Sequence, residues 1–129
     1  MDDVNRPEVV AEVTAAFWRY ENALVVADLE VLSQSFWDDE ATVRFGVADR
    51  QIGAAALRAW RAGQGPLPGR QLFDTQVTTF GDSAASVTTM FRYPGRPRTG
   101  RQSQMWVRFE SEWHIVSAHV SEIAAPPDE

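Results

Sequence analysis

The apolar positions near the start of the chain follow the 3.6-residue period of an α-helix. The residues that recur at steps of three and four are Val10, Val13, Phe17, Tyr20 and Leu24. Because residues at this spacing lie on one side of a helix, they predict a long amphipathic helix over about residues 6–27. Asn5, with Glu8 three residues later, has the spacing of a capping box and marks the predicted start of this helix.

Two shorter helices are predicted after the long one. Asp28 can cap the first of them. Its apolar residues are Leu29, Leu32 and Phe36. A further helix over roughly residues 53–62 turns Leu57 and Trp60 inward, and it ends at the glycines and prolines of residues 63–68.

Strand-like segments make up most of the remaining chain. A short strand within residues 40–46 places Thr42, Arg44 and Gly46 on one face, and a turn follows it. Four longer segments rich in Val, Thr and aromatic residues come later, at 70–80, 84–93, 101–110 and 112–122. Consecutive strands with short links predict an antiparallel meander.

The order of these elements predicts an α+β fold, in which three helices pack on a curved, mainly antiparallel sheet of about six strands. A sheet that curls around the long helix leaves a cone with one open mouth, which suits a small-molecule site. The length of 129 residues predicts a single domain over residues 1–129, with an ordered core of about residues 6–123.

Composition and charge narrow the possible functions. The chain has no cysteine, and all 12 of its basic residues are arginine, so thiolate and lysine chemistry are excluded. A net charge of −6 argues against a nucleic-acid partner. No apolar run is long enough for a membrane span and the first residues are acidic and polar, so we expect no membrane partner and a cytoplasmic address.

The order of elements resembles the cone-shaped superfamily of nuclear transport factor 2, ketosteroid isomerase and scytalone dehydratase, which has the NTF2-like, cystatin-like fold. Four segments are similar to a narrower family named for oxalurate catabolism, with relatives in cyanuric acid breakdown (HpxZ/AtzH-like). These are FWRYENAL at 17–24, FWDDEATVRFG at 36–46, GRQSQMWVRFE at 100–110 and WHIVSAHVS at 113–121. The resemblance implies a small, flat, anionic substrate of the ureide type.

Tyr20 and Arg44 are the first catalytic candidates. Tyr20 is either a boundary tyrosine with its hydroxyl in water or, as the resemblance implies, a donor to a developing oxyanion inside the cone. Arg44 either meets solvent or, as the resemblance implies, faces the cavity. There its guanidinium can hold a carboxylate through two hydrogen bonds.

His119 is the third catalytic candidate. Strand alternation is expected to place it on one face with Ile115, Ser117 and Ser121. It is either a hydrogen-bonded core histidine or, as the superfamily resemblance implies, a proton donor or acceptor. Neither histidine of the chain has an acidic cluster beside it, so we expect no metal and no cofactor.

The candidates for substrate binding are Trp37, Gln104, Trp106 and Arg108. The tryptophans are alternatively core or dimer-interface residues. Gln104 shares a predicted strand face with Trp106 and Arg108, and its amide can match the N–H and C=O groups of a urea. Trp18 lies off the apolar face of the first helix and marks a possible interface.

Two functions are consistent with these residues. One is a cofactor-free enzyme that hydrolyses or decarboxylates a small carboxylated urea-like anion, in which Arg44 holds the carboxylate and Tyr20 donates to a carbonyl oxygen. The other is a non-catalytic binding protein or accessory subunit of a pathway amidase, because no general base or nucleophile stands out. A homodimer is expected in both cases, with Trp106 and Met90 on the outer sheet face.

Overall fold

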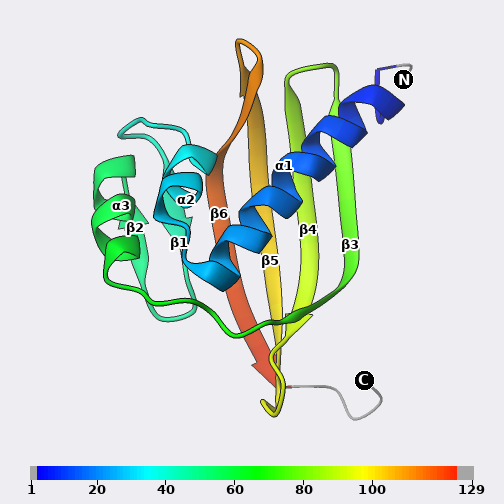
Figure 1. The fold of residues 1–129 in the computed structure, drawn as a ribbon. Helices are drawn as coiled ribbons and strands as arrows, with labels where there is room; N and C mark the ends of the chain where they lie inside the picture. Colours follow the sequence, from blue (N-terminus) through cyan, green and yellow to red (C-terminus); the bar gives the residue numbers. More distant parts are fainter. Residues whose placement is uncertain (1–2, 125–129) are drawn as a thin grey trace.

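Three helices pack on a six-stranded sheet in the part of the chain that the structure, a computed structural model, describes, which is residues 3–124 (Figure 1). The ends of the predicted domain 1–129 lie outside this range. The elements are α1 (Pro7–Val26), α2 (Leu29–Ser35), β1 (Val43–Phe45), β2 (Arg50–Ile52), α3 (Ala54–Ala62), β3 (Gln71–Phe80), β4 (Ala84–Arg92), β5 (Arg98–Phe109) and β6 (Glu112–Ala124). The predicted α+β class and order of elements are confirmed.

The strands are ordered β2-β1-β6-β5-β4-β3 across the sheet. All neighbours are antiparallel except β1 and β6, which run parallel. Strands β3 to β6 form the predicted meander, and the short strand that carries Arg44 lies beside the last of them. Residues 63–70 connect α3 to β3, which lies at the opposite edge of the sheet from α3 and β2 (Figure 1).

The two predicted helix caps have different outcomes. The carboxylate of Asp28 accepts a hydrogen bond from the backbone N–H of Val31 at 3.2 Å, so the cap of α2 is confirmed. The capping box at α1 is wrong, because the side chain of Asn5 accepts from the backbone N–H of Thr79 in β3 at 2.9 Å. Glu8 pairs instead with the arginine two residues before it. Asn5 therefore attaches the start of α1 to the edge strand.

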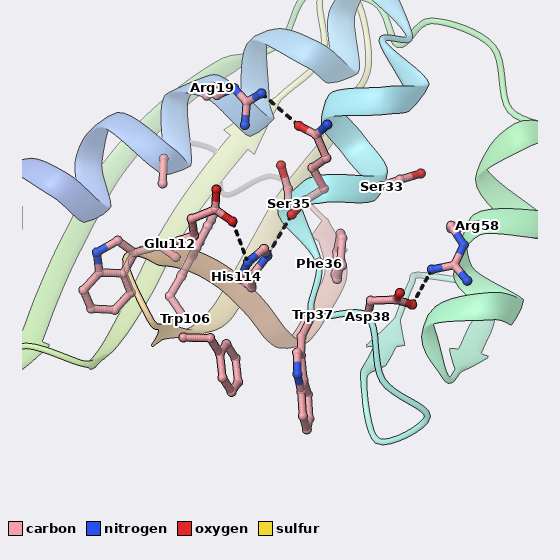
Figure 2. A pocket seen from close by; sticks show the side chains of 14 residues that line it. Arg19, Ser33, Ser35, Phe36, Trp37, Asp38, Arg58, Trp106, Glu112 and His114 are labelled. Carbon is pink, nitrogen blue, oxygen red and sulfur yellow. Dashed lines mark hydrogen bonds and ion pairs between the residues drawn. The ribbon is translucent and has the colours of Figure 1, made fainter.

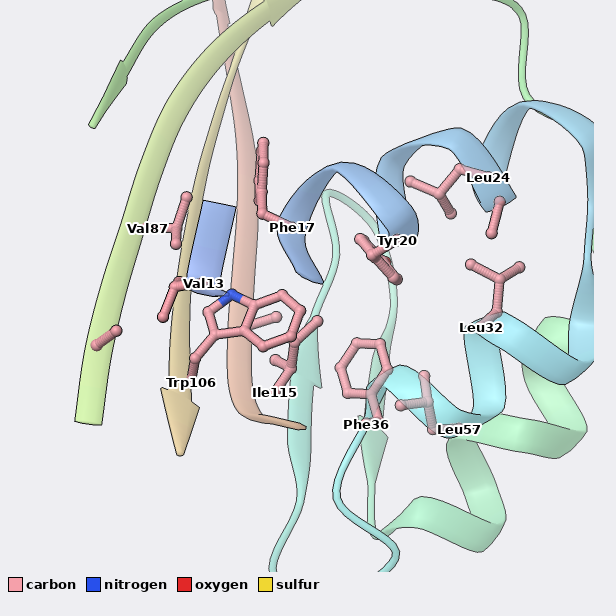
Figure 3. Close-up of a cluster of buried hydrophobic side chains, with 13 residues drawn as sticks. Val13, Phe17, Tyr20, Leu24, Leu32, Phe36, Leu57, Val87, Trp106 and Ile115 are labelled. Carbon is pink, nitrogen blue, oxygen red and sulfur yellow. The ribbon is translucent and has the colours of Figure 1, made fainter. Parts of the chain in front are cut away.

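Apolar side chains of α1 pack against the inner face of the sheet and against α2 and α3 (Figure 3). The cluster includes Val13, Phe17, Tyr20 and Leu24 of α1 together with Val87, Trp106 and Ile115 of the sheet. Burial of one such large side chain stabilises the fold by about 1.5–3 kcal/mol. Trp106 is only 1% exposed within this cluster, so its predicted position on the outer face with Met90 is wrong. No helix within residues 3–124 is both long and apolar enough to cross a membrane.

A β-bulge divides β6 into two parts. Met105 and Trp106 are consecutive in β5, but their partners in β6 are Ser117 and Ile115. Val116 is therefore an extra residue with no partner of its own in this pairing. An extra residue reverses which side chains of a strand face inward.

The reversal decides where His119 lies. Ile115, before the bulge, is fully buried on the helix side of the sheet, and Ala118, after the bulge, is buried on that side too. His119 consequently points to the outer face and is exposed. The prediction that His119 shares a face with Ile115 is wrong, because simple alternation does not hold across Val116.

Candidate functional site

A cavity of about 210 Å³, at the place where the sequence predicts the interior of a cone, lies between α1, β1, α3 and the inner face of β4, β5 and β6. Three of the catalytic and substrate-binding candidates predicted from the sequence line it, namely Tyr20, Arg44 and Gln104. They come from α1, β1 and β5, so the fold brings together positions that are far apart in the chain. Tyr20 and Gln104 are buried in its wall, whereas Asp49 in the β1–β2 turn is exposed and lies at the rim.

Arg44 faces the cavity, and its charge is compensated within the protein. Its Nη1 atom donates to Asp49 Oδ1 at 2.8 Å and to Gln51 Oε1 at 3.0 Å. Its guanidinium carbon lies 4.4 Å from the ring centroid of Trp60. Gly46 makes room for this pair, because a Cβ atom at that position would lie 2.5 Å from Asp49 Oδ1 and 2.8 Å from Arg44 Nη1.

Arg61 of α3 also lines the cavity, and the sequence analysis missed it. It is 8% exposed, its Nη2 atom donates to the hydroxyl oxygen of Tyr20 at 3.3 Å, and it forms no salt bridge with any residue in the described range 3–124. Burial lowers the pKa of Arg61, and the positive charge of Arg44 acts in the same direction, while Tyr20 and the negative charge of Asp49 oppose part of the shift. Its position four residues after Leu57 puts it on the inward face of α3, which was a signal available in the sequence.

A second buried arginine, Arg70, differs from Arg61 because it is paired with a carboxylate. Its Nη2 atom donates to both carboxylate oxygens of Glu21, at 2.8 and 2.9 Å, and to Gln102 Oε1 at 3.2 Å. The Gln102 amide nitrogen donates to Glu21 Oε2 at 3.2 Å, and the Arg70 guanidinium lies over the ring of Phe91 at 4.1 Å. Burial alone would lower the pKa of Arg70, but the charge of Glu21 outweighs it and raises that pKa.

The cavity therefore has a definite charge balance. Four arginines line it, and three of them face a carboxylate in the pairs Arg44–Asp49, Arg70–Glu21 and Arg96–Glu122. Arg61 is the exception among the described residues. An uncompensated buried charge is costly, so the cavity is suited to an anion that would pair with Arg61.

The remaining candidates do not join this cavity. His119 packs edge-on against Phe45 on the outer sheet face, with ring centroids 5.9 Å apart. Trp106 is a core residue that reaches the site only through its indole nitrogen, which donates to Gln104 Oε1 at 2.9 Å. Arg108 has its Nη1 atom 4.0 Å from a carboxylate oxygen of Glu12 in α1.

Trp37 lies in a different hollow, a groove of about 770 Å³ between α1, α2 and the end of the β5–β6 hairpin (Figure 2). Its ring stacks on Phe109 with centroids 5.1 Å apart. Several polar groups of this groove are paired within the protein, as in the 2.8 Å ion pair between Arg58 and Asp38 and the 2.8 Å hydrogen bond from the ring of His114 to a backbone oxygen of α2 (Figure 2). Arg19 also lines the groove and donates to the neutral Gln34 Oε1 at 3.1 Å, but it is exposed, so the described residues of the groove include no buried unpaired charge comparable to Arg61.

Comparisons with known proteins agree with this architecture. An AtzH-like family model matches residues 2–126 of the chain. Among solved structures, a cystatin-like fold protein from Burkholderia xenovorans is 48% identical with a TM-score of 0.92, over 95% of this chain and 98% of that chain. A protein of unknown function from Pectobacterium atrosepticum is 44% identical with a TM-score of 0.91, over 95% and 97%. An NTF2-like protein of unknown function from Pseudomonas putida shares the fold at 17% identity and a TM-score of 0.75, over 90% and 87%.

No curated protein matches the sequence. The distant structural likeness concerns the fold alone, and it confirms the predicted NTF2-like, cystatin-like architecture. The family model extends over nearly the whole chain, which includes every element that builds the cavity. The protein is thus a member of the AtzH-like family.

Proposed function

We propose that the protein binds a small carboxylated urea-like anion in the cone and hydrolyses or decarboxylates it without a cofactor. The observation that carries the proposal is Arg61, a buried guanidinium that has no carboxylate partner within residues 3–124 and lies beside the hydroxyl of Tyr20. Membership of the AtzH-like family supports the ureide class of substrate. In this arrangement the ligand carboxylate pairs with Arg61, whereas Arg44, the residue predicted from the sequence to hold it, already pairs with Asp49.

The same donors would assist either reaction. In decarboxylation the bond between nitrogen and the carboxylate carbon breaks and carbon dioxide leaves. The electron pair that remains on nitrogen is shared with the adjacent carbonyl oxygen. Water then returns a proton to nitrogen. In hydrolysis that carbonyl oxygen becomes the oxyanion of the tetrahedral intermediate. Tyr20 and Gln104 line the place where this negative charge would develop. One such pre-positioned donor contributes on the order of 10²–10³ in rate.

The test uses purified protein and two measurements. Binding of N-carbamoylglycine, a stable carboxylated urea-like anion, is measured by calorimetry, and release of carbon dioxide or ammonia is measured with carboxylated ureas. Arg61→Met is expected to abolish binding, and Tyr20→Phe to lower turnover by on the order of 10²-fold. Undiminished binding in Arg61→Met, or undiminished turnover in Tyr20→Phe, would contradict the proposed roles.

A non-catalytic binding or accessory subunit is the second candidate, and one observation favours it. The carboxylates that line the cavity, Asp49 and Glu122, are both engaged in ion pairs, as is Glu21 next to Arg70, so none of them is a free general base. Binding of the anion without turnover, together with co-elution with the amidase of the same pathway, would support this role. Turnover by the isolated protein with no co-elution would reject it.

A further inference from the structure

Two of the buried polar side chains that line the cavity, Gln104 and Tyr20, are each held by a group that can only donate a hydrogen bond. The Trp106 indole N–H donates to Gln104 at 2.9 Å, and the Arg61 guanidinium donates to Tyr20 at 3.3 Å. Indole and guanidinium groups have no acceptor atom. The Gln104 atom that meets Trp106 must therefore be its amide oxygen, and the Tyr20 oxygen must be the acceptor from Arg61.

This arrangement fixes the direction of the hydrogen bonds offered to a ligand. With its oxygen held by Trp106, Gln104 has its NH₂ group left to offer to the cavity that it lines. Tyr20, whose oxygen receives the Arg61 N–H, keeps its own hydroxyl hydrogen free to donate. Because Arg61 also presents only N–H groups, the buried wall of the cavity offers donors from all three residues.

The neighbouring Gln102 shows that the orientation is specific to Gln104. The two glutamines are two residues apart on β5 and line the same cavity. Gln102 accepts from Arg70 and donates to Glu21, so both ends of its amide are occupied. The amide nitrogen of Gln104 has no partner within residues 3–124, and it is left for a ligand.

We propose that Trp106 is a positioning residue, which locks the Gln104 amide so that the buried wall selects ligands that present a carbonyl oxygen and rejects ligands that present N–H groups there. This inference rests on the proposed binding of an anion in the cone. It assigns an orientation as well as a class: the carboxylate and carbonyl oxygens lie toward Tyr20, Arg61 and Gln104. The N–H groups of the ligand lie toward the exposed rim, where Asp49 is an acceptor.

A matched pair of ligands tests the selection. N-carbamoylglycine carries a urea oxygen where guanidinoacetate carries an N–H group, and the two are otherwise alike in shape. Calorimetry is expected to show that the wild-type protein prefers N-carbamoylglycine. The difference in net charge contributes to that preference, but a substitution of Trp106 by another uncharged residue leaves this contribution unchanged.

Trp106→Phe releases the amide so that it can flip, and it is expected to reduce the ratio of the two affinities on the order of 10-fold. Gln104→Met, which removes the amide, is expected to reduce the ratio to a similar extent and serves if Trp106→Phe does not fold. Trp113→Phe is the matched control, because the Trp113 indole also donates at 2.9 Å, to Glu12 on α1, but Trp113 does not line the cavity. The ratio of the two affinities measured for Trp113→Phe should equal that of the wild-type protein.

If Trp106 has a purely structural role, Trp106→Phe would weaken the binding of both ligands equally and leave the ratio of their affinities unchanged. That result would overturn the inference, while the proposed anion site would stand. An unchanged ratio in Gln104→Met would overturn it in the same way. Failure of the wild-type protein to bind either ligand would remove both the anion site and the inference that rests on it.

Discussion

Two buried arginines on the same cavity, Arg61 and Arg70, have opposite relations to their surroundings. Arg70 is held by both oxygens of Glu21, whereas Arg61 meets only the neutral hydroxyl of Tyr20 as a hydrogen-bond acceptor. Loss of one member of a buried ion pair leaves the other charge without compensation, which is strongly destabilising. Removal of a lone buried charge has the reverse effect, since it eliminates the cost of keeping that charge out of water.

The first prediction follows from this contrast and concerns stability without ligand. Arg70→Met should lower the free energy of unfolding by about 3 kcal/mol, because it leaves Glu21 buried and unpaired. Arg61→Met should leave that free energy unchanged or raise it by about 1 kcal/mol. Urea denaturation followed by tryptophan fluorescence measures both. Equal destabilisation by the two substitutions would contradict the charge balance described for the cavity.

Residues of the site were predictable from the sequence to different degrees. Strand alternation and family resemblance together pointed Arg44 into the cone, and helix periodicity placed Tyr20 at the edge of the buried face. Arg61 was missed because a charged residue near the end of a short helix is ordinarily solvated. Its spacing from Leu57 places it on the inward face of α3, and the contacts with Tyr20 and Trp60 show that it is buried there.

At the scale of elements, the register of β4 and β5 depends on a small residue. Gly100 of β5 pairs with Phe91 of β4, and a Cβ atom at Gly100 would overlap the ring of Phe91. That ring lies 4.1 Å from the Arg70 guanidinium, so the strand pairing also supports the wall of the site. The glycine therefore serves close packing between strands rather than a turn.

The second prediction compares two glycines. Gly100→Ala should lower the free energy of unfolding by about 1–3 kcal/mol, because the added methyl group displaces the buried Phe91 ring. Gly65→Ala is the control, since a Cβ atom there meets nothing within 4 Å, and its effect should stay within about 0.5 kcal/mol. Thermal and urea unfolding of both variants give the comparison. A Gly100→Ala protein as stable as the wild type would contradict the tight contact.

Element order and boundaries were largely predictable because the helices have a clear apolar period and the strands are separated by turn residues. The bulge at Val116 was not. A single valine within a strand rich in β-branched residues carries no local sign that it is extra, and only the pairing with β5 reveals it. The misplacement of His119 follows from this one residue.

At the scale of the molecule, binding should be linked to folding. The third prediction is that N-carbamoylglycine at one hundred times its dissociation constant raises the free energy of unfolding by about 2.7 kcal/mol. The same concentration should leave the stability of Arg61→Met unchanged, because the buried guanidinium supplies the affinity. Unfolding curves with and without ligand measure the effect. Equal stabilisation of the wild-type protein and Arg61→Met would mean that the ligand binds outside the Arg61 cavity.

The outer face of the sheet supports the prediction of a homodimer. Its shallow hollow is lined by Phe45, Met105, Ser103 and their neighbours, and none of the lining residues is an aspartate, glutamate or arginine. Phe45 is 39% and Met105 40% exposed, which is high for large apolar side chains. In a chain of net charge −6, a second copy can approach most easily through a hollow whose lining carries no aspartate, glutamate or arginine.

The fourth prediction follows from this face. The wild-type protein should have the mass of a dimer at micromolar concentration, and Met105→Glu should convert it to a monomer, because the substitution places a negative charge opposite its own copy. Light scattering coupled to size-exclusion chromatography measures the mass. Trp18→Glu is the control, since Trp18 is similarly exposed at 42% but lies on α1. A wild-type monomer would contradict the prediction.

The extra residue in β6 gives the last strand two separate tasks. Before Val116 the inward side chain is Ile115, which belongs to the hydrophobic core, and after Val116 the inward side chains are Ala118, which belongs to the core and lines the cavity, and Val120, which lines the cavity. Substitutions at Val120 can therefore change the wall of the cavity without changing the core contacts of Ile115. Deleting that one valine would exchange interior and exterior along the rest of the strand.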